Sequence, residues 1–284
     1  MTKLILLVDG SPYGESVCDL AAWVAAKTDA GIDLLHVLGR RETGSGPSNL
    51  SGSLGLGAKR ALLDKLAAHD EERARLAKER GRAILEGARE RLSAAGVSNV
   101  TERLRHGDLI EAVRDAEPDA DLIVLGKRGE GADFASSHLG SNLERIVRAA
   151  KKPVLVASRS IPPMKRALIA FDGGESVRKA VDHIAKGRLF RDMPIDLLMA
   201  GEPRSGAQAA FDAAANTLEQ AGKTVTQVRR SGEPEDAITD HVEAHGSSIL
   251  VMGAYGHARI RTLIIGSTTT SMIRKCRIPV MLFR

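Results

Sequence analysis

The sequence predicts two tandem α/β domains, each built on a doubly wound, five-stranded parallel sheet flanked by helices. Short apolar runs rich in Leu, Ile and Val alternate with segments of helical periodicity, an order typical of a parallel sheet covered on both faces. The pattern occurs twice along the 284 residues, a length that suits two domains of ordinary size. Aromatic residues make up only 3% of the chain, so aliphatic side chains must fill the cores.

The repeat can be followed element by element. KLILLVDGSPYGESV at 3–17 is similar to KRALIAFDGGESV at 165–177, and this alignment pairs Asp9 with Asp172. Each stretch holds an apolar strand, an Asp-Gly, a short loop and the start of an amphipathic helix. Four further pairs follow in the same order: 31–39 with 194–202, 106–115 with 231–240, 120–129 with 247–256, and 151–158 with 276–283. Each copy therefore predicts a ligand crevice at the carboxyl ends of its strands.

The expected domains are residues 1–158 and 165–284, because SRSIPPMK places two prolines between a last strand and a new first strand. The first domain carries an insertion at about 40–75 without a counterpart in the second. Its Gly/Ser-rich first half predicts a loop, and the stretch that follows, to about Ala95, predicts an amphipathic helix. The apolar side chains expected to face inward along this helix are Leu62, Leu66, Ile84, Leu85, Ala88 and Leu92.

Composition narrows the range of partners. The formal net charge is +5 and the pI is about 9.3, but basic and acidic residues are interleaved and aromatics are few, so we expect no nucleic-acid partner. Cys18 and Cys276 lack the spacing of a disulfide, zinc or redox motif. No apolar segment has the length of a signal peptide or membrane span, so we expect no membrane partner and a cytoplasmic location.

A glycine-rich stretch, VMGAYGHARIRTLIIGSTTT at 251–270, is the clearest candidate for a ligand site. An apolar strand ends at Gly253, Gly256 follows, and after nine more residues Gly266-Ser267 precedes a predicted helix. Glycines let a backbone approach a ligand closely, and amides at a helix N-terminus attract anions. The pattern also fits a tight crossover in which Ser267 only caps the helix, and spacing alone does not separate these alternatives.

The first copy has a related stretch, VLGKRGEGADFASSHLGSN at 124–142. The G-x-x-G, nine-residue, G-[ST] pattern after the fourth strand, with the duplicated Asp-Gly turns and final Pro-Val strands, resembles the universal stress protein family. The resemblance covers nearly the whole chain apart from the insertion. It implies a Rossmann-like or flavodoxin-like (adenine nucleotide alpha hydrolase-like) fold, ATP or a related adenine nucleotide as ligand, with or without Mg²⁺, and a role as a stress-response sensor or regulator.

The resemblance also implies which residues contact the nucleotide. In the second copy they are Asp172, Gly173, Ala200, Met252, Gly253, Gly256, His257, Gly266, Ser267 and Thr268. In the first copy they are Asp9, Gly10, Val37, Leu125, Gly126, Gly129, Gly140, Ser141 and Asn142. It further implies that the domains pair through their last strands, PVLVA and PVMLF, so that one chain mimics a dimer, and it leaves open a homodimer of chains.

The two copies match this pattern unequally. The second has the nine-residue spacing and carries His257, Arg259 and Arg261 in its loop, although its turn after the first strand is shorter. The first has ten residues at this point and places Glu130 and Asp133 among them, where negative charge repels phosphates, yet it keeps an Asp-Gly-Ser-Pro turn. We therefore expect the second copy to be the better nucleotide site.

We expect no dedicated catalytic group and at most slow ATP hydrolysis, since the sequence contains no G-x-S-x-G or H-E-x-x-H motif. Asp9 and Asp172 could hold Mg²⁺ or simply form turns. His241 and His245, four residues apart on a predicted helix, are expected to face solvent rather than a metal, and Cys18 is expected in the core. A nucleotide-free scaffold and a weak ATPase are the alternatives to a nucleotide-binding regulator.

Overall fold

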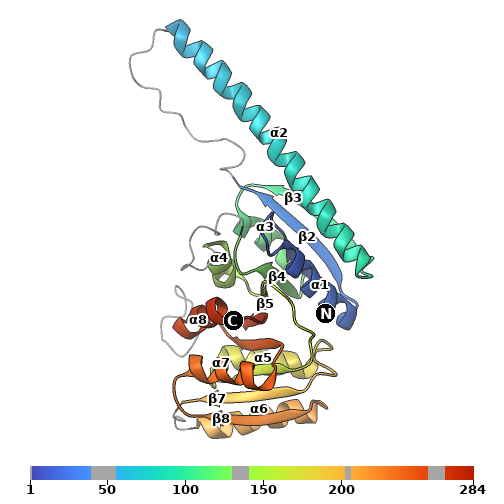
Figure 1. Cartoon of the computed structure of the whole chain (residues 1–284), viewed down its shortest axis with the longest axis vertical. Coiled ribbons are helices and arrows are strands. Elements are labelled where there is room, and N and C mark those ends of the chain that lie inside the picture. Colours follow the sequence, from blue (N-terminus) through green and yellow to red (C-terminus); the bar gives the residue numbers. More distant parts are fainter. Residues whose placement is uncertain (1, 40–55, 130–140, 202–205, 255–265) are drawn as a thin grey trace.

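The structure is a computed structural model that describes residues 2–39, 56–129, 141–201, 206–254 and 266–284 (Figure 1). The elements of the first copy are β1 (Lys3–Leu7), α1 (Gly14–Thr28), β2 (Gly31–Leu38), α2 (Leu56–Ala94), β3 (Val100–His106), α3 (Leu109–Ala116), β4 (Leu122–Gly126), α4 (Ser141–Ala149) and β5 (Val154–Ala157). Those of the second are β6 (Ala167–Ala170), α5 (Glu175–Lys186), β7 (Ile195–Ala200), α6 (Ala207–Gln220), β8 (Val225–Arg230), α7 (Pro234–His245), β9 (Ile249–Gly253), α8 (Ser267–Lys275) and β10 (Val280–Phe283). The alternation of strands and helices confirms the predicted α/β class.

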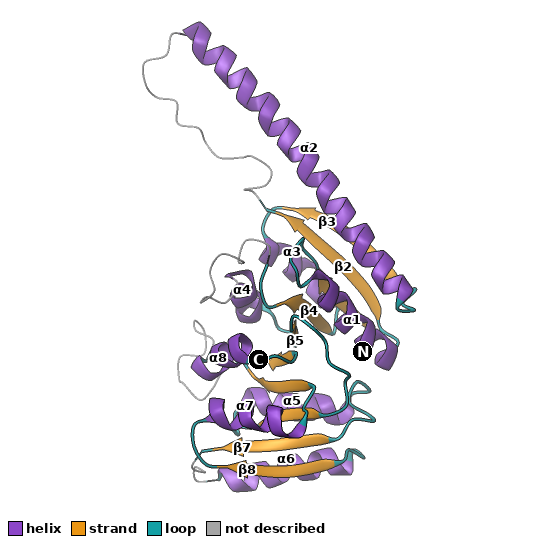
Figure 2. Ribbon diagram, viewed as in Figure 1, coloured by secondary structure: helices purple, strands orange, loops and turns teal. Residues whose placement is uncertain are grey.

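The ten strands of the described residues form one sheet, in the order β3-β2-β1-β4-β5-β10-β9-β6-β7-β8. Each half is parallel throughout, and the halves meet where β5 and β10 pair antiparallel, with Leu155 opposite Met281. The predicted pairing through PVLVA and PVMLF is therefore confirmed. The two five-stranded sheets form a single continuous sheet, with the copies at its two ends (Figure 2).

Helices cover both faces of this sheet. On one face α1, α2, α5 and α6 pack against one set of strand residues, and on the other face α3, α4, α7 and α8 pack against the alternate set. In β1, Leu4 and Leu6 face the first layer of helices, whereas Ile5 and Leu7 face the second. Because both faces of the inner strands are buried, those strands are mostly apolar runs, which is the signal that predicted a parallel sheet, whereas the edge strands β3 and β8 are polar.

Helix α2 packs on the sheet only along its C-terminal half. The predicted inward residues that are buried there are Leu85, Ala88 and Leu92. The prediction for Leu66 was wrong: 36% of its surface is exposed, because the N-terminal half of α2 extends beyond the edge of the sheet (Figure 1). In that half Arg75 pairs with Glu72 and Glu79 across neighbouring turns, so contacts within the helix stand in for tertiary packing.

Each half of the sheet buries one aspartate in its second strand. Asp33 in β2 and Asp196 in β7 occupy equivalent positions of the repeat, with 1% and 2% of their surfaces exposed. Lys3 Nζ lies 3.5 Å from one oxygen of Asp33, and Arg103 Nε lies 2.8 Å from the other. A carboxylate buried this deeply needs such partners, since removing its hydration is costly.

Asp196 has a different second partner. Arg166 Nη1 donates to Asp196 Oδ1 at 2.7 Å, and His241 Nε2 lies 2.8 Å from Oδ2. His241 is 2% exposed, and its ring stacks on that of His245 with the centroids 4.1 Å apart. The expectation that both histidines face solvent was therefore wrong for His241, because α7 places its ring against β7, where it meets the buried carboxylate.

We predict that Asp196→Ala lowers the free energy of unfolding by about 3 kcal/mol, because Arg166 and the buried His241 ring lose their shared acceptor. Chemical denaturation measures the loss. Asp240→Ala removes an exposed carboxylate from the same helix as His241 and should change stability by less than about 0.5 kcal/mol. Equal losses of stability in the two variants would show that the buried contacts of Asp196 with Arg166 and His241 contribute no more than an exposed carboxylate does.

A second prediction concerns His183 in α5, whose ring centroid lies 5.3 Å from that of Phe283 in β10. Burial lowers the pKa of His183 below its ordinary value of 6.5. The folded chain therefore resists a proton that the unfolded chain accepts, so this contribution to stability is full above about pH 6.5 and declines as the pH falls below it. Between about pH 7 and about pH 5, the midpoint of thermal unfolding should fall less in His183→Phe than in the wild type. If the midpoints of both proteins fall equally, His183 is excluded as the source of the pH dependence.

Candidate functional site

The strand order brings the carboxyl ends of particular strands together. The chain passes from β1 outward to β2 and β3 and then crosses back to β4 on the other side of β1, and β6 and β9 have the same relation in the second copy. Leu6 lies opposite Val124, and Ala170 lies opposite Met252. Ligands of such sheets bind in the crevice where the crossovers diverge, so the candidate sites lie at the ends of β1 and β4 and of β6 and β9.

In the second copy, several predicted residues meet at this edge. Asp172 and Gly173 follow β6, Met252 and Gly253 end β9, and Ala200 ends the neighbouring strand β7. Asp172 is exposed, Ala200 and Gly253 are half-buried, and Met252 is buried. The parallel register therefore brings the carboxylate of Asp172, two glycines and the side chains of Ala200 and Met252 to the same strand edge.

The Asp-Gly turns after β1 and β6 have similar hydrogen bonds. Asp172 Oδ1 accepts the amide of Gly174 at 2.9 Å, and Asp9 Oδ1 accepts the amide of Ser11 at 3.1 Å. Gly173 has a φ of 74°, in the left-handed region that favours glycine. These bonds fit the turn-forming alternative for both aspartates, and Mg²⁺ binding stays a prediction.

Hydrogen bonds join the two ends of the glycine loop in the second copy. Thr269 Oγ1 donates to the carbonyl of Gly253 at 3.0 Å, and the amide of Gly266 donates to the carbonyl of Ala254 at 3.3 Å. Helix α8 begins at Ser267, which is exposed, and Gly266 caps it without a side-chain acceptor. First-turn amides have no acceptor within a helix, so this end of α8 presents donors and a positive dipole at the strand edge.

In the first copy the glycine loop lies against Asp9 and Tyr13. A Cβ on Gly129 would lie 2.9 Å from Asp9 Oδ2, and a Cβ on Gly126 would lie 2.7 Å from Tyr13 Cβ. Close approach therefore requires glycine at both positions. Tyr13 belongs to the longer turn after β1, and the shorter turn after β6 has no equivalent residue. The two candidate sites thus differ beside the strand ends.

The remaining predicted residues fall into three groups. Those near strand or helix ends are Gly10 and Asn142, both exposed, Val37 and Thr268, both half-buried, and Leu125, which is buried. Ser141 is the first residue of α4. Gly140, Gly256 and His257 lie outside the described residues. Thr269, which holds the loop ends together, was not predicted, although the run of threonines after Gly266-Ser267 was a signal that could have found it.

Two basic side chains that the sequence did not single out connect the copies. Lys127, inside the first glycine loop, is buried and donates to the backbone carbonyl of Cys276 at the C-terminal end of α8. Arg284 Nη1 donates to the carbonyl of Arg148 in the last turn of α4 at 2.7 Å. Each copy therefore supplies a cation to the C-terminal end of a helix in the other, where the helix dipole favours positive charge. Burial lowers the pKa of Lys127.

Clusters of metal-ligating side chains and membrane-spanning helices are both absent from the described ranges. No group of three or more His, Cys, Asp and Glu side chains is placed there to hold a metal ion. None of the helices described combines the length and the apolar character needed to cross a bilayer. Cys18 is buried in α1, as expected, and burial raises the pKa of its thiol to about 11, so it is a core residue rather than a nucleophile.

A duplicated, doubly wound α/β sheet, with a glycine loop and a helix N-terminus at the switch point of each copy, defines the class of this protein. The model of the universal stress protein family matches residues 1–158 and again residues 163–284. The chain therefore belongs to the universal stress protein family and carries two copies of its domain.

Individual relatives agree with this assignment. Universal stress protein Slr1230 of Synechocystis sp. is 37% identical over 287 residues, with 100% of each chain covered. A universal stress protein structure from Archaeoglobus fulgidus DSM 4304 has a TM-score of 0.68 at 20% identity and covers 99% of this chain and 98% of its own. The functionally unknown protein PA1789 from Pseudomonas aeruginosa PAO1 has a TM-score of 0.63 at 15% identity, covering 100% and 92%. At these identities the two structures establish the fold alone.

We predict that Thr269→Val lowers the free energy of unfolding by about 1 kcal/mol, because the carbonyl of Gly253 loses its hydroxyl donor while the side chain keeps its shape. Chemical denaturation checks this. Thr270→Val makes the same change one residue later, at a half-buried position, and should have a smaller effect. If the two variants have the same stability, the bond between Thr269 and Gly253 does not hold the loop.

Proposed function

We propose that this universal stress protein binds ATP or a related adenine nucleotide and acts as a cytoplasmic stress-response sensor or regulator. The observation that carries the proposal is the joined glycine loop of the second copy, whose ends lie at the edge of β9 beside the N-terminus of α8. Backbone amides, a helix dipole and the hydroxyls of Ser267 and Thr268 are suited to bind phosphates. The proposed units are residues 1–158 and 165–284, each with one such site.

In the second copy, we assign the phosphates and ribose to the glycine loop and the start of α8. This part of the proposed site comprises Gly253, Gly256, His257, Gly266, Ser267 and Thr268. The adenine end is assigned to the ends of β6, β7 and β9. That part comprises Asp172, Gly173, Ala200 and Met252. The exposed carboxylate of Asp172 at the strand edge is chemically suited to bind a Mg²⁺ that accompanies the phosphates.

The first copy is proposed as the weaker site. Asp9 Oδ2 lies so close to Gly129 that a Cβ there would be 2.9 Å away, which puts a carboxylate against the loop that would have to accept phosphates. Tyr13 packs equally closely on Gly126. We propose binding with at most slow hydrolysis, since no described side chain at either strand edge forms the base-and-nucleophile pair that a dedicated ATPase needs.

A nucleotide-free scaffold is the second candidate function. The contacts of Lys127 with Cys276 and of Arg284 with Arg148 favour it, because they join the copies directly through protein groups. In this case the paired sheets themselves, rather than an occupied site, would present a surface to a partner.

We predict that Thr268→Asp weakens ATP binding by about tenfold or more, because it places a carboxylate in the first turn of α8 beside the phosphates. The same charge suits the positive end of the helix dipole, so the free energy of unfolding should change by less than about 0.5 kcal/mol. Titration calorimetry with Mg-ATP measures the affinity, and chemical denaturation measures the stability.

Asn142→Asp makes the matching change at the equivalent position of α4 in the first copy. It should have the smaller effect on affinity if the second copy is the main site. Affinity that is unchanged in both variants would exclude these helix ends as phosphate sites. A wild-type protein that gives no binding heat and releases no nucleotide on denaturation would favour the scaffold.

A further inference from the structure

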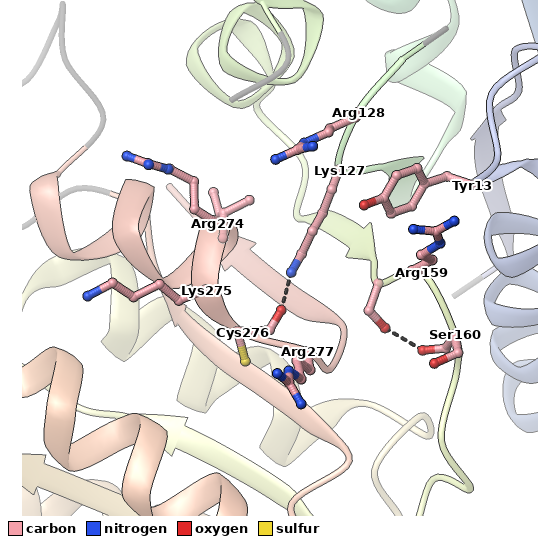
Figure 3. A pocket seen from close by; sticks show the side chains of 11 residues that line it. Tyr13, Lys127, Arg128, Arg159, Ser160, Arg274, Lys275, Cys276 and Arg277 are labelled. Carbon is pink, nitrogen blue, oxygen red and sulfur yellow. Dashed lines mark hydrogen bonds between the residues drawn. The ribbon is translucent and has the colours of Figure 1, made fainter. Parts of the chain in front are cut away.

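A pocket of about 420 Å³ lies at the junction of the two copies, beside the glycine loop of the first. Figure 3 shows that it opens between the residues after β4 and β5 of the first copy and the last turn of α8 in the second. Neither Asp9 nor Asn142 of the first candidate site, nor Asp172 nor Thr268 of the second, is among the described residues that line it. The pocket adjoins the first candidate site through Tyr13, Lys127 and Arg128, and it extends from there to the second copy.

The side chains around this junction pocket are strongly basic. Six of the described lining residues carry positive charge: Lys127, Arg128, Arg159, Arg274, Lys275 and Arg277. The others are neutral: Tyr13, Ser158, Ser160, Ile273 and Cys276. No acidic residue is among the described lining residues, in a chain whose charges are elsewhere interleaved. Like charges gathered around one cavity repel each other unless an anion enters it.

Lys127 and Lys275 each make a structural contact. Lys127 donates to the carbonyl of Cys276, and Lys275 Nζ lies 3.2 Å from Glu235 of α7. In the part of the chain that the structure describes, no ion pair is formed by Arg159, Arg274 or Arg277. Arg274 and Arg277 lie three residues apart at the C-terminal end of α8, where the helix dipole favours positive charge. Arg159 follows β5 of the first copy, so this helix end does not explain its presence at the pocket.

The arrangement of the arginines favours an elongated anion. Figure 3 shows basic side chains spread across the pocket, with Arg274 on the side of α8, Arg128 above Lys127 and Arg159 on the opposite side next to Tyr13. Guanidinium groups bind phosphate oxygens through paired hydrogen bonds, and several phosphates in a row would engage arginines from both walls. A pocket of about 420 Å³ also exceeds what a single small anion fills.

We propose that the junction pocket binds an oligophosphate chain, either an inorganic polyphosphate or the phosphate tail of a nucleotide. The pocket shares Lys127 and Arg128 with the first glycine loop, but the proposal does not require a nucleotide at either strand edge. Because the walls of the pocket belong to different copies, a bound chain holds α8 of the second copy against the first glycine loop and stabilises the pairing of the two halves.

Inorganic tripolyphosphate is the probe, titrated calorimetrically into the full chain at low and at high salt. We expect one site per chain, with affinity that falls as salt rises. Arg159→Gln/Arg277→Gln removes two exposed charges from the pocket and should weaken binding about tenfold or more. Arg105→Gln/Arg114→Gln removes two exposed charges from β3 and α3 and should leave the affinity unchanged. If both double variants lose the same affinity, tripolyphosphate responds only to the net charge of the protein, and the proposed site would be overturned.

The variant Asn142→Asp/Thr268→Asp separates this site from the nucleotide sites. Tripolyphosphate binding should persist in it at wild-type affinity, and its loss would overturn the junction site by assigning the probe to the helix N-termini. Displacement of the bound probe by ATP in this variant would support the phosphate tail of a nucleotide as the ligand. Retention of the probe against ATP would support an inorganic chain. A wild-type chain that binds no tripolyphosphate at low salt would also overturn the proposal.

Discussion

The antiparallel pairing of β5 with β10 is the contact on which the rest of the architecture depends. It converts two parallel sheets, each of which would otherwise expose an apolar edge strand, into one sheet whose remaining edges are the charged strands β3 and β8. Leu155 and Met281, opposite each other at this junction, are fully buried. The pairing also sets the C-terminal end of α8 beside the first glycine loop, where Lys127 reaches the carbonyl of Cys276.

The two copies keep one scaffold but differ where ligands would bind. Both bury an aspartate in the second strand and pair it with a basic residue at the start of the first, Lys3 in one copy and Arg166 in the other. The second partner comes from β3 in the first copy and from α7 in the second. At the strand ends, one copy packs Tyr13 over its glycine loop, whereas the other has a shorter turn. The two copies therefore share the buried aspartate and its basic partner at the start of the first strand of each sheet, and they differ at the strand ends where ligands would bind.

Most of the fold could be predicted from the sequence because its signals are local. Apolar runs, helical periods and the repeat define the elements, and parallel strands necessarily bring their ends to one edge, which placed Asp172 and Gly253 near each other. The contacts that were missed depend on tertiary neighbours. The carbonyl that Lys127 reaches is far away in the sequence, and the burial of His241 depends on how α7 turns against β7. The periodicity that included Leu66 continues past the point where the sheet ends, and periodicity cannot show where a packing partner stops.

That last feature has a consequence for the dynamics of the chain. The outer half of α2 carries Leu63 and Leu76 with 43% and 51% of their surfaces exposed, and its stability rests on helix propensity and on exposed ion pairs, each worth only about 0.5 kcal/mol. Its backbone amides therefore exchange with solvent through local fraying, at a free energy well below that of global unfolding. The amides of the inner half, which Leu92 anchors to the sheet, exchange with solvent only when the sheet itself unfolds. A single continuous helix thus spans two cooperative units of different stability.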